Sequence, residues 1–203
     1  MRFALVDNKR FEAKPGLKGL CPGCSQPVIA KCGRQRVHHW AHQANGTCDR
    51  WWEPETEWHR SWKSLFPADC QEVFLSDDQT GEKHVADVRT NHGLVIEFQH
   101  SHIKPEERIS REQFYKNMIW VVDGTRLKRD WLRFKKQHDD HRKFGDSEFL
   151  SVSFPDETFP KIWIESAIPV VFDFKDNTPS EDPKDILKER LWVLLPGRRG
   201  TMQ

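Results

Sequence analysis

The alternation of hydrophobic and polar residues along the chain predicts most of its secondary structure. Apolar residues at every second position predict strands, and apolar residues three and four positions apart predict helices. The segment ETEWHRSWKSLF, residues 55–66, has the helical spacing, and Pro67 ends it. Residues 104–117 predict a second helix, because Pro105 lies near its first turn. Strands are expected in residues 1–20 around the Pro15-Gly16 turn and at 72–75, 85–88, 94–99, 118–124, 149–154, 160–164 and 169–174.

The order of these elements predicts the fold class. The continuous apolar run MIWVVDG, residues 118–124, is typical of a strand covered on both faces of its sheet. A strand, a helix and this strand in succession indicate a crossover unit, so we expect an α/β fold with a mixed sheet flanked by helices. We expect three regions, at residues 1–50, 51–145 and 146–203. Within the last region, a polar linker is expected at 176–185 and a final helix or strand at 185–195.

A β-hairpin is predicted at residues 84–99, with polar side chains where apolar ones are expected. A three-residue loop at 91–93 that ends in glycine is a common hairpin connection. This loop sets Asp87 opposite Glu97, and Gln99 lies two residues further along the same sheet face. The other face is expected to hold the apolar side chains of the hairpin: Ala86, Val88, Ile96 and Phe98.

The opposed carboxylates of Asp87 and Glu97 indicate a metal site. Directly opposed strand residues have Cα atoms about 4.5–5.5 Å apart, so the two negative charges repel each other. A divalent cation removes that repulsion, and Mg²⁺ prefers oxygen ligands. The alternative is a solvated face on which both side chains point to water. The Val, Ile and Phe residues around them disfavour it.

Length and composition limit the classes of protein to consider. The 203 residues, with 9 Trp and 13 Phe, predict one large domain or one domain with a small appended module. The formal net charge of +1 means that any affinity for nucleic acid comes from local clusters. No apolar run reaches membrane-spanning length, and the first residues lack the apolar stretch of a signal peptide. We therefore expect a cytoplasmic protein with no membrane association.

The cysteines and the histidines near them predict a zinc module within residues 1–50. Five cysteines, an odd number crowded toward the N-terminal end, suit metal binding in a reducing compartment better than disulfides. The turn CPGC directs two thiolates to one ion, and HWAH follows at a zinc-finger-like distance. Cys32 or Cys48 in place of one histidine, and His38 by register, stay open alternatives. We predict one structural Zn²⁺ with four ligands: Cys21, Cys24, His39 and His42.

The ordered set of motifs resembles a known family. Asp87, followed ten positions later by Glu97 in the triplet EFQ, resembles the D-x(n)-E-x-K signature of the PD-(D/E)xK nuclease superfamily, with Gln99 in place of lysine. The segments HVADV, GLVIEFQHSHI and ERISREQFYKNMIWVVDG resemble the competence protein CoiA-like nuclease family, as do CPGC, HWAH and EWHxxW upstream. The resemblance covers residues 20–124. It implies a restriction-endonuclease-like core within 51–145.

The resemblance implies a metal-dependent phosphodiester nuclease and a role for each motif residue. Asp87 and Glu97 would bind Mg²⁺ or Mn²⁺, and the backbone carbonyl of Phe98 would be a further ligand. The cation would lower the pKa of a bound water and neutralise the phosphate. Gln99 would hold that water without supplying the charge of a lysine.

The first helix would supply another acid to the metal shell. Glu55 and Glu57 lie about 200° apart on a helix, so only one can face the site. The match to EWHxxW favours Glu57, and an acid solvated at the helix N-terminus is the alternative. His59 would contact phosphate, or else be a structural histidine.

Basic residues after the hairpin are candidates for binding nucleic acid. Arg108, Arg111 and Tyr115 share one helix face, on which arginine could grip phosphate, with ion pairs to Glu107 and Glu112 as the alternative. The run that follows could track a nucleic-acid backbone or solvate a helix: Arg126, Lys128, Arg129, Trp131, Arg133, Lys135, Lys136, Arg142 and Lys143.

The sequence thus predicts Mg²⁺-dependent cleavage of nucleic acid, DNA more than RNA, in DNA uptake, processing or defence. A homodimer or a larger DNA-processing complex is compatible with this reading. Two other readings compete with it. One is a DNA-binding partner that keeps the fold without cleaving, since Gln99 lacks charge, and the other is a protein-interaction module.

Overall fold

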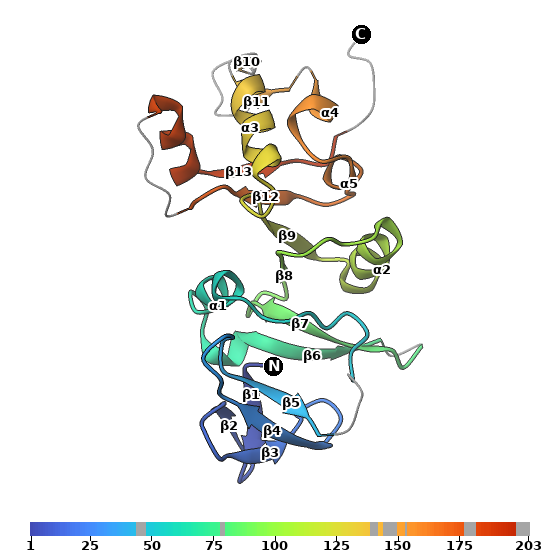
Figure 1. Ribbon diagram of the computed structural model, residues 1–203. Coiled ribbons are helices and arrows are strands. Elements are labelled where there is room, and N and C mark those ends of the chain that lie inside the picture. Colours follow the sequence, from blue (N-terminus) through green and yellow to red (C-terminus); the bar gives the residue numbers. More distant parts are fainter. Residues whose placement is uncertain are drawn as a thin grey trace. The chain divides into compact units, whose positions relative to one another are not determined.

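The computed structural model describes residues 1–43, 48–77, 80–138, 142–143, 150–152, 154–176 and 182–197. The chain divides into two compact units, Met1–Glu97 and Phe98–Gln203, and each is described by itself (Figure 1).

The first unit begins with an antiparallel sheet of five strands in the order β2-β1-β3-β4-β5. Its strands are β1 (Phe3–Val6), β2 (Lys9–Glu12), β3 (Lys18–Leu20), β4 (Pro27–Lys31) and β5 (His39–His42). Ala4, Val28 and Trp40 are among the buried residues of its small core. The Trp40 indole N–H donates to the Phe11 carbonyl at 2.9 Å, which satisfies the polar atom of an otherwise apolar core.

A helix and three further strands complete the first unit. These elements are α1 (Glu57–Lys63), the 3₁₀ helix η1 (Ala68–Cys70), β6 (Gln71–Ser76), β7 (Lys83–Arg89) and β8 (Val95–Gln99), whose last two residues belong to the second unit. Strand β7 pairs antiparallel with both β6 and β8, and Val88 lies opposite Ile96. Gly93 has a φ of 80°, as the three-residue hairpin loop requires.

The second unit contains a mixed sheet with helices around it. Strand β12 (Val170–Asp173) is parallel to β9 (Met118–Asp123) and antiparallel to β13 (Leu191–Leu194). Phe134 and Phe172 are among the aromatic residues that fill its core. The remaining elements are α2 (Pro105–Tyr115), α3 (Lys128–Gln137), β10 (Arg142–Lys143), β11 (Leu150–Ser151), α4 (Pro155–Thr158), α5 (Lys161–Ile164) and η3 (Pro183–Glu189).

The predicted α/β class, with a mixed sheet and flanking helices, is confirmed, and so are the hairpin and the helices at 55–66 and 104–117. The strand expected at 160–164 is wrong, because this segment forms helix α5. Pro160 lies at its N-cap position, and Trp163 packs near Trp120 with ring centroids 5.5 Å apart. Part of the expected linker, 177–181, lies outside the described residues. No helix in the described part of the chain is long and apolar enough to cross a membrane.

Candidate functional site

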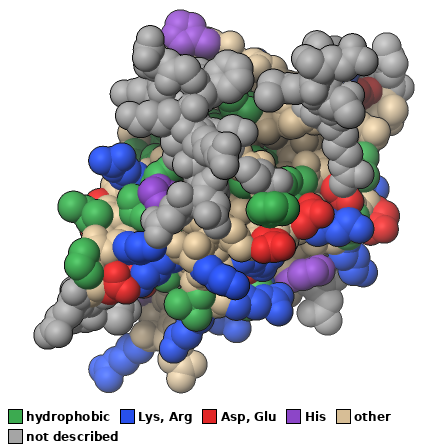
Figure 2. All heavy atoms as spheres, turned by 90° about the horizontal axis from the view of Figure 1, so that it is seen from above, with side chains coloured by type: hydrophobic (Ala, Val, Ile, Leu, Met, Phe, Trp, Pro, Cys, Tyr) green, Lys and Arg blue, Asp and Glu red, His purple; other side chains and the backbone are tan. Residues whose placement is uncertain are grey.

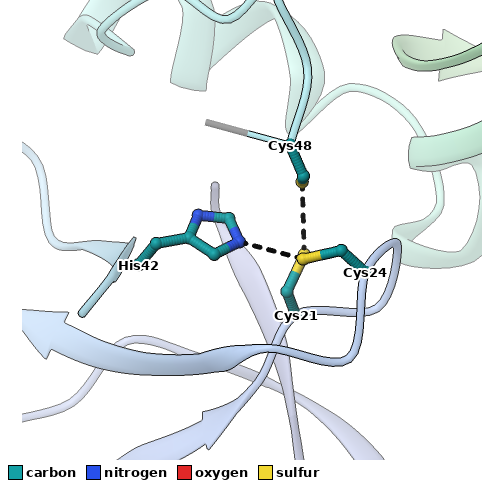
Figure 3. A group of neighbouring side chains, drawn as sticks. All are labelled: Cys21, Cys24, His42 and Cys48. Carbon is teal, nitrogen blue, oxygen red and sulfur yellow. Dashed lines mark hydrogen bonds between the residues drawn. The ribbon is translucent and has the colours of Figure 1, made fainter. Parts of the chain in front are cut away.

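Three cysteines and one histidine of the first unit converge on one point (Figure 3). The ligand atoms of Cys21, Cys24, His42 and Cys48 all lie within 4.8 Å of one another. The Cys21 and Cys48 sulfurs are 3.6 Å apart, and the Cys24 sulfur is 3.2 Å from His42 Nε2. Four ligands held about 2.0–2.3 Å from a tetrahedral Zn²⁺ lie about 3.3–3.8 Å from each other. The cluster therefore has the donor set and the spacing of a structural metal site.

The CPGC turn is shaped by close packing. The Ser25 N–H donates to the Cys21 carbonyl at 2.9 Å, and the Cys21 N–H donates to the Gln26 carbonyl at 2.9 Å. A Cβ on Gly23 would lie 1.9 Å from the ring of Phe74, so only glycine fits there. The turn consequently brings both thiols to the same side.

Strand geometry separates the two histidines that the sequence paired. His39 and His42 are both in β5, three residues apart, so their side chains point to opposite faces. His42 points into the cluster, whereas His39 Nδ1 lies 2.9 Å from the Val37 carbonyl. Cys48, one of the alternatives left open by the sequence, completes the four ligands in the structure.

The cluster favours a bound cation on electrostatic grounds. Burial, with the nearby Cys21 thiol, raises the pKa of Cys48 to about 12, and burial raises the pKa of Cys21 as well. Burial lowers the pKa of His42, which keeps the imidazole neutral and able to bind metal. A divalent cation would stabilise the thiolates that burial alone disfavours.

The residue after Cys48 connects this cluster to the hairpin. Asp49 is buried and accepts the Val85 N–H at 2.7 Å, and it lies 2.8 Å from His84 Nδ1. His84 is 2% exposed and stacks on Trp51 with ring centroids 3.2 Å apart. The loop that carries Cys48 is thus fixed to β7, the strand that carries Asp87.

The hairpin holds the predicted acids in different environments. Glu97 is 3% exposed, and its carboxylate accepts the backbone N–H of Asp87 at 3.1 Å. Asp87 is half-buried, with a side chain that is 26% exposed. Glu97 therefore does not lie on a solvated face, and the alternative in which both acids simply point to water is wrong for this residue.

A buried lysine lies among the acids of the first unit. Lys63 of α1 is 3% exposed, and its Nζ lies 2.7 Å from Glu55, 3.2 Å from Glu72 and 3.6 Å from Asp87. Burial alone would lower the pKa of Lys63, but the three carboxylates raise it above its ordinary value. Arg60 forms a second ion pair with Glu55.

The acid that lies in this group is Glu55 rather than Glu57. Helix α1 begins at Glu57 because Thr56 is its N-cap, so Glu55 precedes the helix and its side chain, 7% exposed, turns inward. Glu57 is exposed at the first helical position. His59 is buried and forms the capping box with Thr56, which is the structural role that the sequence left open.

Gln99 and the residues after it lie in the second unit. Gln99 is 1% exposed, and its amide nitrogen donates to the Ser101 carbonyl at 3.1 Å, which orients the amide. The next residue, His100, lies 2.6 Å from Asp123 at the end of β9. Phe98, the other residue of this end of β8, is buried.

The predicted phosphate-binding face of α2 is buried and ion-paired. Arg108 is 2% exposed and donates two bonds of 2.7 Å to Glu112. Arg111 is 5% exposed and pairs with Glu107 at 2.5 Å, and Tyr115 is also buried. The structure thus contains the ion pairs that the sequence offered as the alternative, and phosphate contact by these side chains stays a prediction.

The basic run is divided between ion pairs and solvent. Lys135 pairs with Asp182 and Asp185, and Arg133 pairs with Asp130 at 2.8 Å. Exposed basic residues of the run are Arg126, Lys128, Arg129 and Lys136, whereas the side chains of Arg142 and Lys143 lie outside the described residues. On the face drawn in Figure 2, lysine and arginine side chains are interspersed with acidic and apolar ones.

Sequence patterns did not identify Asp49, Lys63, Glu72 or His84, and the motif favoured Glu57 over Glu55. The charged residues among them are buried in pairs, and pairing across the chain leaves no periodic signal. A local signal existed for Glu55, since Thr56 followed by His59 marks the beginning of the helix.

Two family profiles match the chain. Residues 9–50 match the profile "Competence protein CoiA, N-terminal domain", and residues 82–157 match "Competence protein CoiA, nuclease-like domain". Together they cover more than half of the chain. No curated protein and no solved structure matches it.

Proposed function

The chain belongs to the competence protein CoiA family and carries its nuclease-like domain, and on this premise we propose that it is a divalent-cation-dependent nuclease that hydrolyses DNA. The observation that carries the proposal is the pairing of Glu97 with Asp87. A carboxylate that is 3% exposed, held at the backbone of a second acid, is costly to bury unless a cation balances the charge.

The residues of the hairpin have the donors that Mg²⁺ or Mn²⁺ requires. Asp87 and Glu97 would hold the cation, with the Phe98 carbonyl as a further ligand by its place in the motif. When bound, such a cation supplies a water of lowered pKa and positive charge for the phosphate. Glu97 fixes the Asp87 backbone through the bond of 3.1 Å, which keeps both acids in place before substrate arrives.

Gln99 would orient a water or a phosphate oxygen through its amide, and it brings no charge to the reaction. What supports this role is its nearly complete burial and the bonds to Ser101, which fix the amide in one orientation. Glu55 and Glu57 are the candidates for a third acid near the cation. Burial beside Lys63 supports Glu55 in this role, and the match to the family motif supports Glu57.

The cysteine cluster would bind Zn²⁺ in a structural role. Four protein ligands, Cys21, Cys24, His42 and Cys48, leave no open position for a substrate. The cation would connect Cys48 to the CPGC turn and to His42 of β5.

The test is incubation of the purified protein with plasmid, single-stranded DNA and RNA, in Mg²⁺, Mn²⁺ or EDTA, beside Asp87→Ala. We expect DNA to be cut only with the divalent cation, and cleavage to fall at least about 100-fold in Asp87→Ala while the variant stays folded at the assay temperature, as thermal melting shows. Cutting that survives Asp87→Ala would overturn the assignment of the site. If the wild-type protein binds DNA without cutting it, the protein is a DNA-binding partner rather than a nuclease. If it neither binds nor cuts DNA, the protein is a protein-interaction module.

A further inference from the structure

Lys63 lies where its ammonium group touches three carboxylates at once. Glu55, Glu72 and Asp87 approach Nζ at 2.7, 3.2 and 3.6 Å. The distances to Glu55 and Glu72 are those of hydrogen bonds, whereas Asp87 at 3.6 Å forms a longer ion pair. Since the side chain is only 4% exposed, Lys63 offers little surface to a substrate.

Acidic side chains gather around Lys63. Glu55, Glu72 and Asp87 all form ion pairs with its Nζ, and Glu97 accepts the backbone N–H of Asp87 at 3.1 Å. Other cationic groups act on two of these acids, because Arg60 pairs with Glu55, and Arg10 and the N-terminal ammonium group interact with Glu72. Lys63 therefore shares one positive charge among three acids, of which Asp87 is the most distant from Nζ.

Many phosphodiester-cleaving sites use two metal ions about 3.5–4 Å apart, bridged by a carboxylate. Here Asp87 has one carboxylate oxygen 3.6 Å from a buried ammonium group. A second cation beside that oxygen would meet the lysine charge at close range, without water to screen it.

We propose that Lys63 takes the place of a second metal ion, so that the site binds one divalent cation and Lys63 is a positioning residue for Asp87. This inference rests on the proposed function, and it adds the number of metal ions and a role for the lysine. Lys63 holds the carboxylate oxygen that faces it, and this contact fixes the orientation in which Asp87 would meet the cation.

The test counts Mn²⁺ bound to the zinc-loaded protein by electron paramagnetic resonance, in wild type and in Lys63→Met. Wild type should bind one Mn²⁺ per chain, which Asp87→Ala removes. Lys63→Met should bind a second Mn²⁺, or bind the first at least about 10-fold more tightly, because the group gains a negative charge. Lys63→Arg should resemble wild type. So should Lys175→Met, which removes an exposed lysine that is paired only at the surface.

Two Mn²⁺ in wild type, or an unchanged count and affinity in Lys63→Met, would overturn the role of Lys63 while leaving the nuclease proposal intact. No Mn²⁺ that depends on Asp87 would instead contradict the nuclease proposal itself. If Lys63→Met is unfolded in EDTA, thermal melting tests the role of Lys63 instead. Mn²⁺ should then restore folding, whereas NaCl of equal ionic strength should not. A variant that stays unfolded in Mn²⁺ would also overturn the role of Lys63.

Discussion

The direction of the side chain decides whether His39 or Cys48 can bind a metal beside Cys21 and Cys24. Zinc-finger spacing favours His39, but that spacing belongs to a helix, and the segment is strand β5. Cys48 reaches the cluster from a loop, so no periodicity in the sequence could have selected it.

At this scale we expect Cys48→Ser to lose the zinc and His39→Ala to keep it. Metal analysis should give one zinc per chain in wild type and in His39→Ala, and much less in Cys48→Ser. Because binding of a structural zinc is coupled to folding, Cys48→Ser should also melt several degrees lower. Zinc retained in Cys48→Ser and lost in His39→Ala would restore the ligand set expected from the sequence.

Glu55 and Glu57 provide a second test at the residue scale. Glu55 is buried between Lys63 and Arg60, whereas Glu57 is exposed. We expect Glu55→Gln to lower the cleavage rate by at least about 10-fold and Glu57→Gln to leave it within about 2-fold. The reverse order of the two rates would support the motif assignment of Glu57. Melting curves of both variants show whether a loss of rate is a loss of fold.

At the scale of elements, the hairpin is the part that local sequence predicted best. Its loop, its register and its apolar face depend on residues less than twenty positions apart, and Gly93 fixes the turn. Strands β4 and β5 were not predicted, because the cysteines and histidines of residues 21–50 indicated a metal site and were not interpreted as parts of strands. The segment 160–164 alternates like a strand, but proline at its start permits a helix.

Glu72 joins two elements, and it makes the stability of the first unit depend on pH. Its carboxylate accepts the N–H groups of Arg2 and Phe3 at the beginning of β1, and it pairs with Lys63. Burial alone would raise its pKa, but Lys63, the N-terminal ammonium group and these N–H groups lower it from the ordinary 4.5 to about 2. The stabilisation is therefore complete above pH 4.5 and is lost as the pH falls toward 2.

Because the pKa of Glu72 is lowered from 4.5 to about 2, we expect Glu72→Gln to lower the free energy of unfolding by about 3 kcal/mol at pH 7. The difference between wild type and variant should shrink as the pH falls below 4.5. Urea titrations at several pH values measure it, with Glu12→Gln, an acid that is 46% exposed, as the control. A difference that is constant between pH 7 and pH 3 would mean that the charge of Glu72 contributes nothing.

At the scale of the whole molecule, contacts between distant residues set the limit of prediction from sequence. Asp49 meets His84 and Lys63 meets Asp87 across 35 and 24 positions, and no local pattern records such pairs. The motif that resembles the family predicted Asp87 and Glu97 as metal ligands, but it did not locate the lysine that lies beside Asp87. Likewise, the shared helix face of Arg108 and Arg111 was correct, but only the packing of α2 shows that this face is buried.

The net charge of +1 gives the whole molecule little long-range attraction for DNA, so we expect DNA binding to depend on the exposed lysine and arginine side chains of α3. Reversing the charge of Lys128, Arg129 and Lys136 together should weaken DNA binding equally for different sequences. The slope of log affinity against log salt should fall by about 0.9 for each phosphate of duplex DNA that the variant no longer neutralises. Fluorescence anisotropy at several salt concentrations measures both quantities, and Lys161→Glu, whose side chain is 81% exposed on α5, is the control. An equal effect per charge in this control would mean that net charge alone governs binding. An unchanged affinity in the triple variant would mean that these side chains only solvate the helix.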